Sequence, residues 1–451
     1  MKSRTVMDMI RSVCKLVMVL ITSVAVANIL IIVVYGIPTD RMFSHAKSGA
    51  ELFGSNYIDT WAPGIPSATP SYPTDAIMIN NAIYRDNKSI VFNAMMNPRY
   101  EDGAGNVVSS LSQVLTHDSL NEINPKLSAI APEDSARDDK NTTHELETMY
   151  YPRYWHGYLL FLKPMLLVLD VSEIKILMMT LQITLAALAV FLIDKKIDRG
   201  VAVGFLTTLI ILNPITVALT FQNNTIYVLS LVSMVLILLF NDRLKEKNRY
   251  SVYFMIWGST TCFFDFLTYP LVTLGFSLCL FILLNGKDLG AYVVDMVKYS
   301  IAWSIGYVGL WVGKFISCKL MTGYDLLAAS AKSVLFRMGL DNLGNESYQT
   351  TVLEAIKINV LSISNWISLL IIIVVLSICI VLYNRGYRKD SKREKIYCLL
   401  VLSAYPLIWY AGTKNHSYIH YYMTYRELSI TWFCIMSIIL CDWKRRCRIL
   451  E

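Results

Sequence analysis

The chain has 451 residues, of which 55% are apolar and 17% are charged, and its net charge is +7. Soluble globular domains carry about 25% charged residues, so this composition excludes an ordinary soluble protein. In a membrane protein the distribution of basic residues matters more than their sum, and we expect no nucleic-acid partner.

The first element is an apolar run, "VMVLITSVAVANILIIVVYG" at 17–36, which is long enough to cross a bilayer. The "AVA" at 25–27 resembles a signal-peptidase site, but the apolar run continues about ten residues beyond it, further than a signal peptide needs. We therefore predict a cytoplasmic N-terminus and an uncleaved anchor helix over residues 1–36.

Nine further apolar stretches follow, which predicts about ten membrane crossings and an all-α polytopic membrane protein. The ten stretches lie at 13–36, 174–193, 201–220, 225–240, 251–264, 268–284, 299–317, 361–383, 396–411 and 427–441. Residues 158–451 form the predicted multi-span membrane domain. Within it, "YLLFLKPMLLVLDV" (158–171) is short and contains Lys-Pro, so we interpret it as an interfacial or re-entrant segment.

Basic residues concentrate in alternate connections. They occur in the N-terminal segment, in 194–200, 241–250 and 384–395, and in the tail 444–448. The positive-inside rule makes these segments cytoplasmic, and an even number of crossings then puts both termini inside. The sequence thus predicts a multi-pass plasma-membrane protein whose other connections face outward.

The largest outward segment is residues 37–157, with fifteen acidic against nine basic residues. A second, at 320–358, contains two helix-like stretches, "DLLAASAKSVLFR" and "TTVLEAIKI", which we expect to lie along the membrane surface. All six histidines fall on the outward side, at 45, 117, 144, 156, 416 and 420. Any chemistry is therefore expected outside the cytoplasm.

Nucleotide-binding and redox motifs are absent from the sequence: there is no Walker A, Rossmann glycine pattern, HExxH or CxxC. This argues against an ATP-driven pump and against a nucleotide-sugar enzyme of the soluble type. We expect no cofactor.

Three aspartates at the outer boundary are candidate site residues: Asp40 and Asp75 for acid–base chemistry, and Asp265 for binding phosphate or sugar. Asp40 follows the anchor helix, Asp75 leads a helix-like apolar run, and Asp265 lies between two phenylalanines. Each also has an ordinary structural interpretation: a solvated loop residue for Asp40, a helix N-cap or first-turn acid for Asp75, and a buried ion pair for Asp265. Glu101 and Asp102 are expected in a solvated turn.

Five cationic or titratable side chains are candidates for binding phosphate or sugar, namely Arg153, His156, His416, His420 and Arg426. Both arginines are outward, against the basic-inside bias, and Arg grips a phosphate bidentately. His416 and His420 share a face if the stretch "NHSYIHYYMTYRE" is helical, but a metal site would need a third ligand that is not evident. Snorkelling to the interface is the ordinary interpretation of Arg426.

The layout, together with "YYPRYWHGY", "FFDFLTYPLVTLG" and "NHSYIHYYMTYR", resembles bacterial GT-C-type membrane glycosyltransferases. The resemblance implies a polyprenyl-phosphate-linked sugar as donor, a glycan or lipid of the cell envelope as acceptor, and transfer at the outer face. It implies Asp75 or Asp40 as general base, with Arg and His binding the leaving phosphate. The chain departs from the family pattern because no paired-acid motif opens the first loop, where Asp40 stands beside Arg41.

Two other activities and a noncatalytic role stay open. A polysaccharide polymerase or ligase would use the same lipid-linked substrates. A transporter or flippase for a lipid-linked glycan would tend to carry charges in mid-span, where this chain has few besides Lys314 and Asp265. A receptor or scaffold would favour disulfides in the long loop, which contains no cysteine.

Overall fold

The computed structural model describes residues 2–48, 62, 65–68, 70, 72–102, 107–123, 125–127, 146–341 and 349–445. The ten predicted apolar stretches are mainly helical in it, but 201–220, 361–383 and 396–411 are each divided between two helices. Six helices of the described residues are long and apolar enough to cross a membrane, namely Val13–Tyr35, Val171–Lys196, Phe221–Glu246, Leu289–Thr322, Trp366–Asn384 and the bent pair Arg393–Gly412. The chain is therefore helical and compatible with a multi-pass membrane protein, whereas the number of ten crossings stays a prediction.

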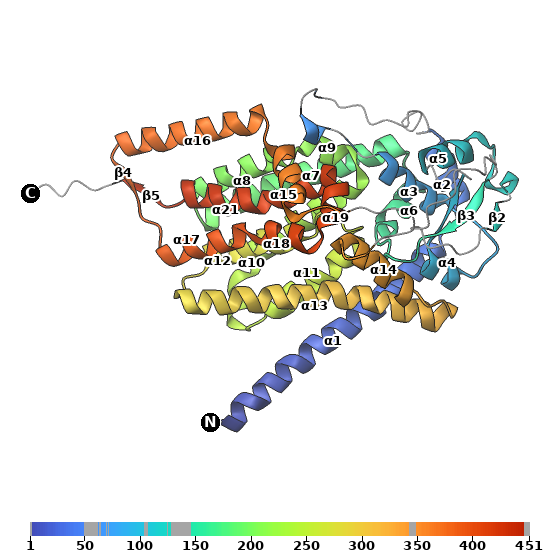
Figure 1. The fold of residues 1–451 in the computed structure, drawn as a ribbon, viewed down its shortest axis with the longest axis horizontal. Helices are drawn as coiled ribbons and strands as arrows, with labels where there is room; N and C mark the ends of the chain where they lie inside the picture. Colours follow the sequence, from blue (N-terminus) through green and yellow to red (C-terminus); the bar gives the residue numbers. More distant parts are fainter. Residues whose placement is uncertain are drawn as a thin grey trace, which may run out of the picture.

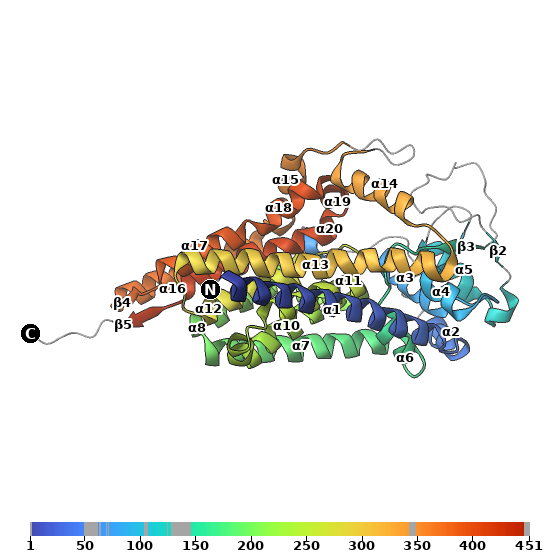
Figure 2. The same cartoon turned by 90° about the horizontal axis from the view of Figure 1, so that it is seen from below.

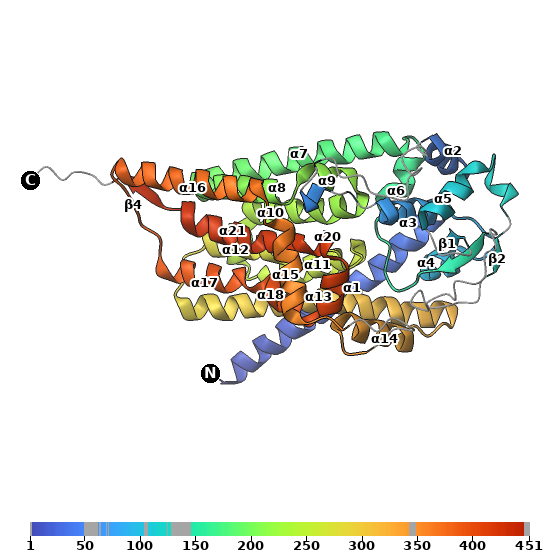
Figure 3. The same cartoon turned by 45° about the horizontal axis from the view of Figure 1, so that its top comes forward.

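The bundle consists of long helices joined by short connections. Its helices are α1 (Lys2–Tyr35), α6 (Leu159–Leu166), α7 (Val171–Lys196), α8 (Arg199–Ile211), α9 (Pro214–Leu219), α10 (Phe221–Glu246), α11 (Tyr250–Phe264), α12 (Leu271–Leu284), α13 (Leu289–Thr322), α14 (Leu327–Met338), α15 (Val352–Ile363), α16 (Trp366–Asn384), α17 (Arg393–Ser403), α18 (Tyr405–Gly412), α19 (Lys414–Ile419), α20 (Tyr421–Thr424), the 3₁₀ turn η4 (Tyr425–Leu428) and α21 (Ser429–Leu440). Figure 1 shows most of the long helices running side by side, with α1 inclined to them, and Figure 2 shows α7 on one side and α14 and α15 on the other. In Figure 3, α7 and α13 lie on opposite sides of the bundle, with α10, α11 and α12 between them.

The segment 37–157 forms a small α/β unit at one end of the bundle. It contains α2 (Asp40–Ser48), η2 (Pro66–Ala68), α3 (Tyr72–Ile83), α4 (Ile90–Met96), β1 (Pro98–Glu101), α5 (Val107–Thr116), η3 (Leu120–Glu122), β2 (Lys126–Leu127) and β3 (Glu147–Tyr150). The strand order is β1-β3-β2, with β1 antiparallel and β2 parallel to β3. The eight cysteines of the described residues are all free, and the core of this unit is continuous with that of the bundle.

The expected solvated turn at Glu101 is wrong. Glu101 is 4% exposed and its Oε2 lies 3.0 Å from Nη2 of the buried Arg99. Asp102 is buried too, with its backbone N–H donating to Ser110 Oγ at 2.8 Å. The charged residues suggest a solvated turn in the sequence, but β1 pairs with β3, and this pairing places Glu101 and Asp102 in the core.

Contacts place the predicted basic connections together at one end of the bundle, here called the basic end. The strand β4 (Tyr387–Lys389) pairs antiparallel with β5 (Trp443–Arg445), which joins the basic segment 384–395 to the tail. Lys395 Nζ donates to Leu283 O at 2.6 Å, and Asn285 Nδ2 to Tyr250 OH at 3.3 Å. Figure 1 shows β4 and β5 opposite the 37–157 unit.

The other connections meet at the opposite end, here called the loop end. Gly157 N donates to Phe263 O at 2.9 Å, and Phe221 N donates to Asp75 Oδ1 at 2.9 Å. His416 Nε2 lies 2.6 Å from Leu267 O. Alternation of the connections between two ends is the arrangement that the charge pattern predicts, although which end faces the cytoplasm stays a prediction.

The second predicted outward segment forms the helices α14 and α15, as expected from its pattern. Both pack over the stretch 414–427 rather than lying alone on a surface (Figure 2). Asn415 Nδ2 donates to Phe336 O of α14, and Asn359 Nδ2 of α15 donates to Ser417 O at 2.8 Å. The two helices therefore fix the position of the histidine-rich stretch.

Candidate functional site

The turn between α11 and α12 is the centre around which most of the predicted site residues gather. Asp265 ends α11 and is 2% exposed. Its Oδ1 accepts from Thr268 N at 2.9 Å and from Thr268 Oγ1 at 2.6 Å, and its Oδ2 accepts from Tyr307 OH at 3.1 Å. Burial raises the pKa of this carboxyl, and the hydrogen bonds oppose that shift. Asp265 thus closes the turn and holds it to α13.

His416 packs on the same turn and is 5% exposed. Its Nε2 lies 2.6 Å from Leu267 O, and because a carbonyl only accepts, Nε2 carries the proton. Nδ1 is then a buried lone pair with no partner among the described residues. Burial, with His420 and Arg337 nearby, holds the pKa of His416 well below its usual range, so the ring is neutral at pH 7.

His420 packs beside His416, with ring centroids 4.7 Å apart and the ring planes inclined by 49°. Burial, and then the charge of Arg337 on α14, lowers the pKa of His420 to about 4. The two histidines therefore offer neutral hydrogen-bonding groups rather than cations. The pair lies on one face, as the i, i+4 spacing predicts.

Arg426 is the most unusual cation of the described chain. It is 1% exposed, and Nη1 donates to Tyr422 O at 2.9 Å, while Nε and Nη2 have no hydrogen-bond partner. Its guanidinium carbon lies 4.7 Å from the ring centroid of Tyr425 and 5.9 Å from that of Tyr269. No described carboxylate forms an ion pair with it. A buried cation in this state is costly unless an anion binds it.

Glu427 follows directly and is fully buried. Its Oε1 accepts from Leu271 N, the first residue of α12, at 3.1 Å, whereas Oε2 has no partner among the described residues. Glu427 is not among the site residues predicted from the sequence. The sequence does contain a signal for it, because a carboxylate at the start of an apolar stretch is costly to bury, as at Asp265, and therefore suggests a functional role.

Asp75 lies in the first turn of α3, as its N-terminal position in the apolar run predicts, and is completely buried. Oδ1 accepts from Phe221 N at the start of α10, and Oδ2 lies 3.1 Å from Lys175 Nζ of α7. Burial raises the pKa of Asp75, and Lys175 opposes that shift. The carboxylate therefore ties the loop unit to two long helices.

The start of α10 also connects Asp75 to the central turn. Tyr269 OH donates to Asn223 O, two residues beyond Phe221, and the Tyr269 ring lies against Arg426. Asp75 is thus one element away from the guanidinium and does not contact it.

His156 packs against the turn from the side of the loop unit. Its ring centroid lies 5.0 Å from that of Phe266, Nε2 bonds to Tyr151 O at 2.8 Å and Nδ1 to Tyr158 OH at 2.9 Å. Burial lowers its pKa well below the usual range. With both ring nitrogens engaged and φ at 55°, His156 shapes the chain at this point.

The two remaining predicted residues lie elsewhere. Arg153 is 6% exposed, and its backbone oxygen accepts from Trp311 Nε1 of α13 at 2.8 Å. Asp40 is exposed, pairs with Arg85 at 2.8 Å and lines a separate hollow of about 260 Å³ beside Lys163. Neither has a described contact with Arg426.

A groove of about 520 Å³ opens beside the central turn between α13, α14 and α18. Leu267 and Leu271 of the turn line its wall, as do Tyr307, which bonds Asp265, and Arg337, which faces the histidines. The other lining residues are mainly apolar or aromatic, among them Trp303, Trp311, Ile408 and Trp409.

Among the described residues no group of three His, Cys, Asp or Glu side chains is arranged to hold a metal ion. The site is instead a buried cluster of hydrogen-bonding groups around the turn between α11 and α12, with the guanidinium of Arg426 beside Tyr269 of that turn. Comparison of the chain with protein-family models, with curated proteins and with solved structures gives no match.

Proposed function

We propose that this protein is a membrane glycosyltransferase that moves a sugar from a polyprenyl-phosphate-linked donor to a cell-envelope acceptor at the loop end. One observation carries the proposal: Arg426 is buried, and among the described residues its Nε and Nη2 have no hydrogen-bond partner and its charge has no carboxylate partner. A phosphate ester at this point would accept both hydrogen bonds and neutralise the charge.

The reaction needs a group that stabilises the phosphate as it leaves. The acceptor hydroxyl oxygen bonds to the anomeric carbon, the bond from that carbon to the phosphate oxygen breaks, and the phosphate keeps the electron pair. Arg426 then faces the developing negative charge in a site that excludes water, where one charged donor contributes most. His416 Nδ1, a lone pair, suits a sugar hydroxyl as hydrogen-bond donor.

A base must take the proton of the acceptor hydroxyl. Glu427 is the first candidate for this role, because its Oε2 has no partner among the described residues and it follows Arg426 in the chain. Burial raises the pKa of this carboxyl well above its usual range, so Glu427 acts as a base only from its ionised form. Asp75 and Asp40, the acids that the family resemblance favours, are engaged with Lys175 and Arg85. They stay candidates, and their variants separate the three possibilities.

The lipid chain of the donor needs an apolar path. The groove between α13, α14 and α18 leads from the central turn along membrane-facing helices, with Arg337 near the histidines. Because the polar atoms of Arg426, Glu427 and His416 are shut off from solvent, a covering element must move before a substrate reaches them. The helix α15 contacts both η4 and η2 and is the element best placed to do so.

The test uses the purified full-length protein in nanodiscs, with polyprenyl phosphate as the binding probe and a panel of polyprenyl-phosphate sugars as donors. Arg426→Gln is expected to weaken phosphate binding about 10- to 100-fold, the range for loss of a charged hydrogen bond. Glu427→Gln is expected to keep binding and to lose transfer. The control Arg243→Gln removes an exposed arginine at the basic end.

Equal binding by wild type and Arg426→Gln would contradict the proposal, as would no binding by the wild type. Transfer retained in Glu427→Gln and lost in a stable Asp75→Asn or Asp40→Asn would move the base to that aspartate.

A polysaccharide polymerase or ligase is the second candidate, since it releases the same lipid phosphate and would use the same guanidinium. Product length separates the two: a single added sugar supports transfer from a monosaccharide donor, and long chains support polymerisation. In a lipid-linked glycan transporter, the buried ammonium group of Lys314 would be expected to face the substrate path. It is engaged with Ala94 O and Asn97 Oδ1 instead.

A further inference from the structure

A second groove lies away from the central turn, between α1 and α11, with a volume of about 750 Å³. One face of each helix forms it. On α1 the lining residues recur at helical spacing from Lys15 to Leu30, and on α11 they run from Arg249 to Phe264. Either wall covers fifteen residue steps, which is about 22 Å at 1.5 Å per residue.

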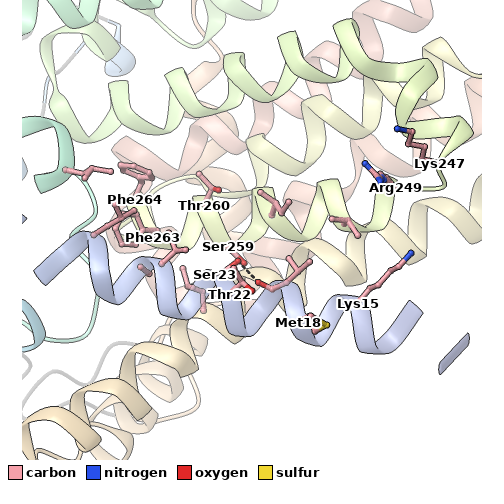
Figure 4. Close-up of a pocket in the computed structure, with 18 of the residues that line it drawn as sticks. Lys15, Met18, Thr22, Ser23, Lys247, Arg249, Ser259, Thr260, Phe263 and Phe264 are labelled. Atoms are coloured by element: carbon pink, nitrogen blue, oxygen red, sulfur yellow. Dashed lines mark hydrogen bonds between the residues drawn. The ribbon is translucent and has the colours of Figure 1, made fainter. Parts of the chain in front are cut away.

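The two ends of this groove differ in chemistry. Lys15, Lys247 and Arg249 stand at one end, and Phe263 and Phe264 close the other (Figure 4). All three cations are exposed, and none has an ion pair with a described residue. Lys247 and Arg249 belong to the connection 241–250 at the basic end of the bundle.

The middle of the groove is mainly apolar, with the hydroxyl side chains of Thr22, Ser23, Ser259 and Thr260 among its lining residues. Ser23 Oγ donates to Val19 O at 2.8 Å within its own helix, and Ser259 Oγ donates to Gly306 O at 3.2 Å. Hydroxyls satisfied in this way leave an apolar surface, which the side chains of Met18, Val26 and Ile256 extend.

We infer that this groove binds one anionic glycerophospholipid of the leaflet at the basic end. Its phosphate lies among Lys15, Lys247 and Arg249, and an acyl chain lies between α1 and α11. The charge fits, because three unpaired cations meet a single phosphate. The length fits as well, because one leaflet of hydrocarbon is about 15 Å thick, which the groove exceeds. The site is independent of the proposed glycosyl transfer, which uses the opposite end.

The experiment is native mass spectrometry of the full-length protein released from nanodiscs that contain equal amounts of phosphatidylglycerol and phosphatidylcholine. The wild type is expected to retain phosphatidylglycerol preferentially. Each cation near a membrane phosphate contributes about five-fold, so the triple variant Lys15→Gln, Lys247→Gln, Arg249→Gln is expected to lose at least about ten-fold of this preference.

A matched control removes the same charge elsewhere, with Lys195→Gln, Lys196→Gln and Lys392→Gln, three exposed lysines that do not line the groove. This control is expected to keep the preference. A second variant, Ile256→Trp, fills the groove without changing charge and is expected to lose the retained lipid. Size-exclusion profiles and melting temperatures confirm that each variant is folded.

Equal retention by the triple variant and its control overturns the inference, because the groove cations then have no special role. Undiminished retention by Ile256→Trp overturns the placement of the chain in the groove. Added polyprenyl phosphate that displaces phosphatidylglycerol at equal concentration overturns the identity of the occupant.

Discussion

Arg426 and Asp75 are two buried charges with opposite circumstances. Asp75 is paired with Lys175 and accepts a backbone hydrogen bond. Arg426 instead contacts a carbonyl and two aromatic rings, and its Nε and Nη2 have no hydrogen-bond partner among the described residues. A buried charge that forms an ion pair with another residue of the chain indicates an architectural role. A charge that the fold leaves open points to a ligand.

Asp75→Asn is expected to destabilise the protein, because it leaves Lys175 buried without its counter-ion. Breaking a buried pair on one side costs about 3–5 kcal/mol. The double variant Asp75→Leu with Lys175→Met is expected to recover most of the loss. The measurement is the melting temperature in detergent, with Asp390→Asn, which breaks an exposed pair with Lys444, as the control without effect.

An unchanged melting temperature of Asp75→Asn would contradict the architectural role of this carboxylate. Lost transfer in that same stable variant would identify Asp75 as the base.

His420 makes stability depend on pH in a defined window. Its pKa is lowered from 6.5 to about 4 in the folded protein, so between these values the unfolded chain binds a proton that the folded chain does not. Stability is therefore expected to fall as the pH decreases from about 6.5 to about 4. His420→Gln is expected to reduce the slope of the melting temperature over this range, and His156 and His416, whose pKa values burial also lowers, account for the slope that is left. A slope identical to that of the wild type would assign the dependence to other groups.

At the scale of elements, α11 and α13 form the most extensive helix contact of the described residues, and glycine makes it possible. A Cβ on Gly258 would lie 2.0 Å from Trp303 O, and one on Gly306 would lie 2.2 Å from Met255 O. The two helices touch backbone to backbone, as small residues allow in membranes. This contact holds α13, whose Tyr307 bonds Asp265, against the central turn.

Gly258→Val is expected to force α11 and α13 apart and to lower the melting temperature by several degrees, because backbone atoms cannot yield as side chains do. Gly412→Ala is the control, since a Cβ there meets nothing within 4 Å. Gly258→Val is also expected to weaken any activity that depends on the central turn. A Gly258→Val protein as stable as the control would show that the contact is looser.

At the scale of the whole molecule, the proposed function depends on one property: the loop end and the basic end must face opposite sides of a membrane. The contacts of β4, β5 and Lys395 group the basic segments, and those of Asp75, Gly157 and His416 group the others. The positive-inside rule then predicts that the basic end is cytoplasmic.

Cysteine labelling in intact cells tests this orientation. In a Cys14→Ser background, which removes an exposed thiol, Asp118→Cys at the loop end is expected to react with a membrane-impermeant maleimide. Lys196→Cys at the basic end is expected to react only after permeabilisation. Labelling of Lys196→Cys in intact cells would reverse the orientation and remove the proposed access to an outer-face donor.

The sequence by itself determined the helices, because apolar runs of membrane-spanning length leave the backbone no other way to satisfy its hydrogen bonds. It also determined the alternation of basic connections and the pattern of α14 and α15. It identified His416, His420, Arg426 and Asp265 as residues worth following, and these do meet around one turn.

Only the tertiary structure decided which charged side chains are paired with another residue of the chain. Lys175 meets Asp75 across a separation of a hundred residues and Arg85 meets Asp40, while Arg426 and Glu427 retain open atoms. Burial and pairing depend on distant elements that pack together, and no local pattern carries that information. For this reason the proposed function rests on the guanidinium of Arg426 and not on the paired aspartates.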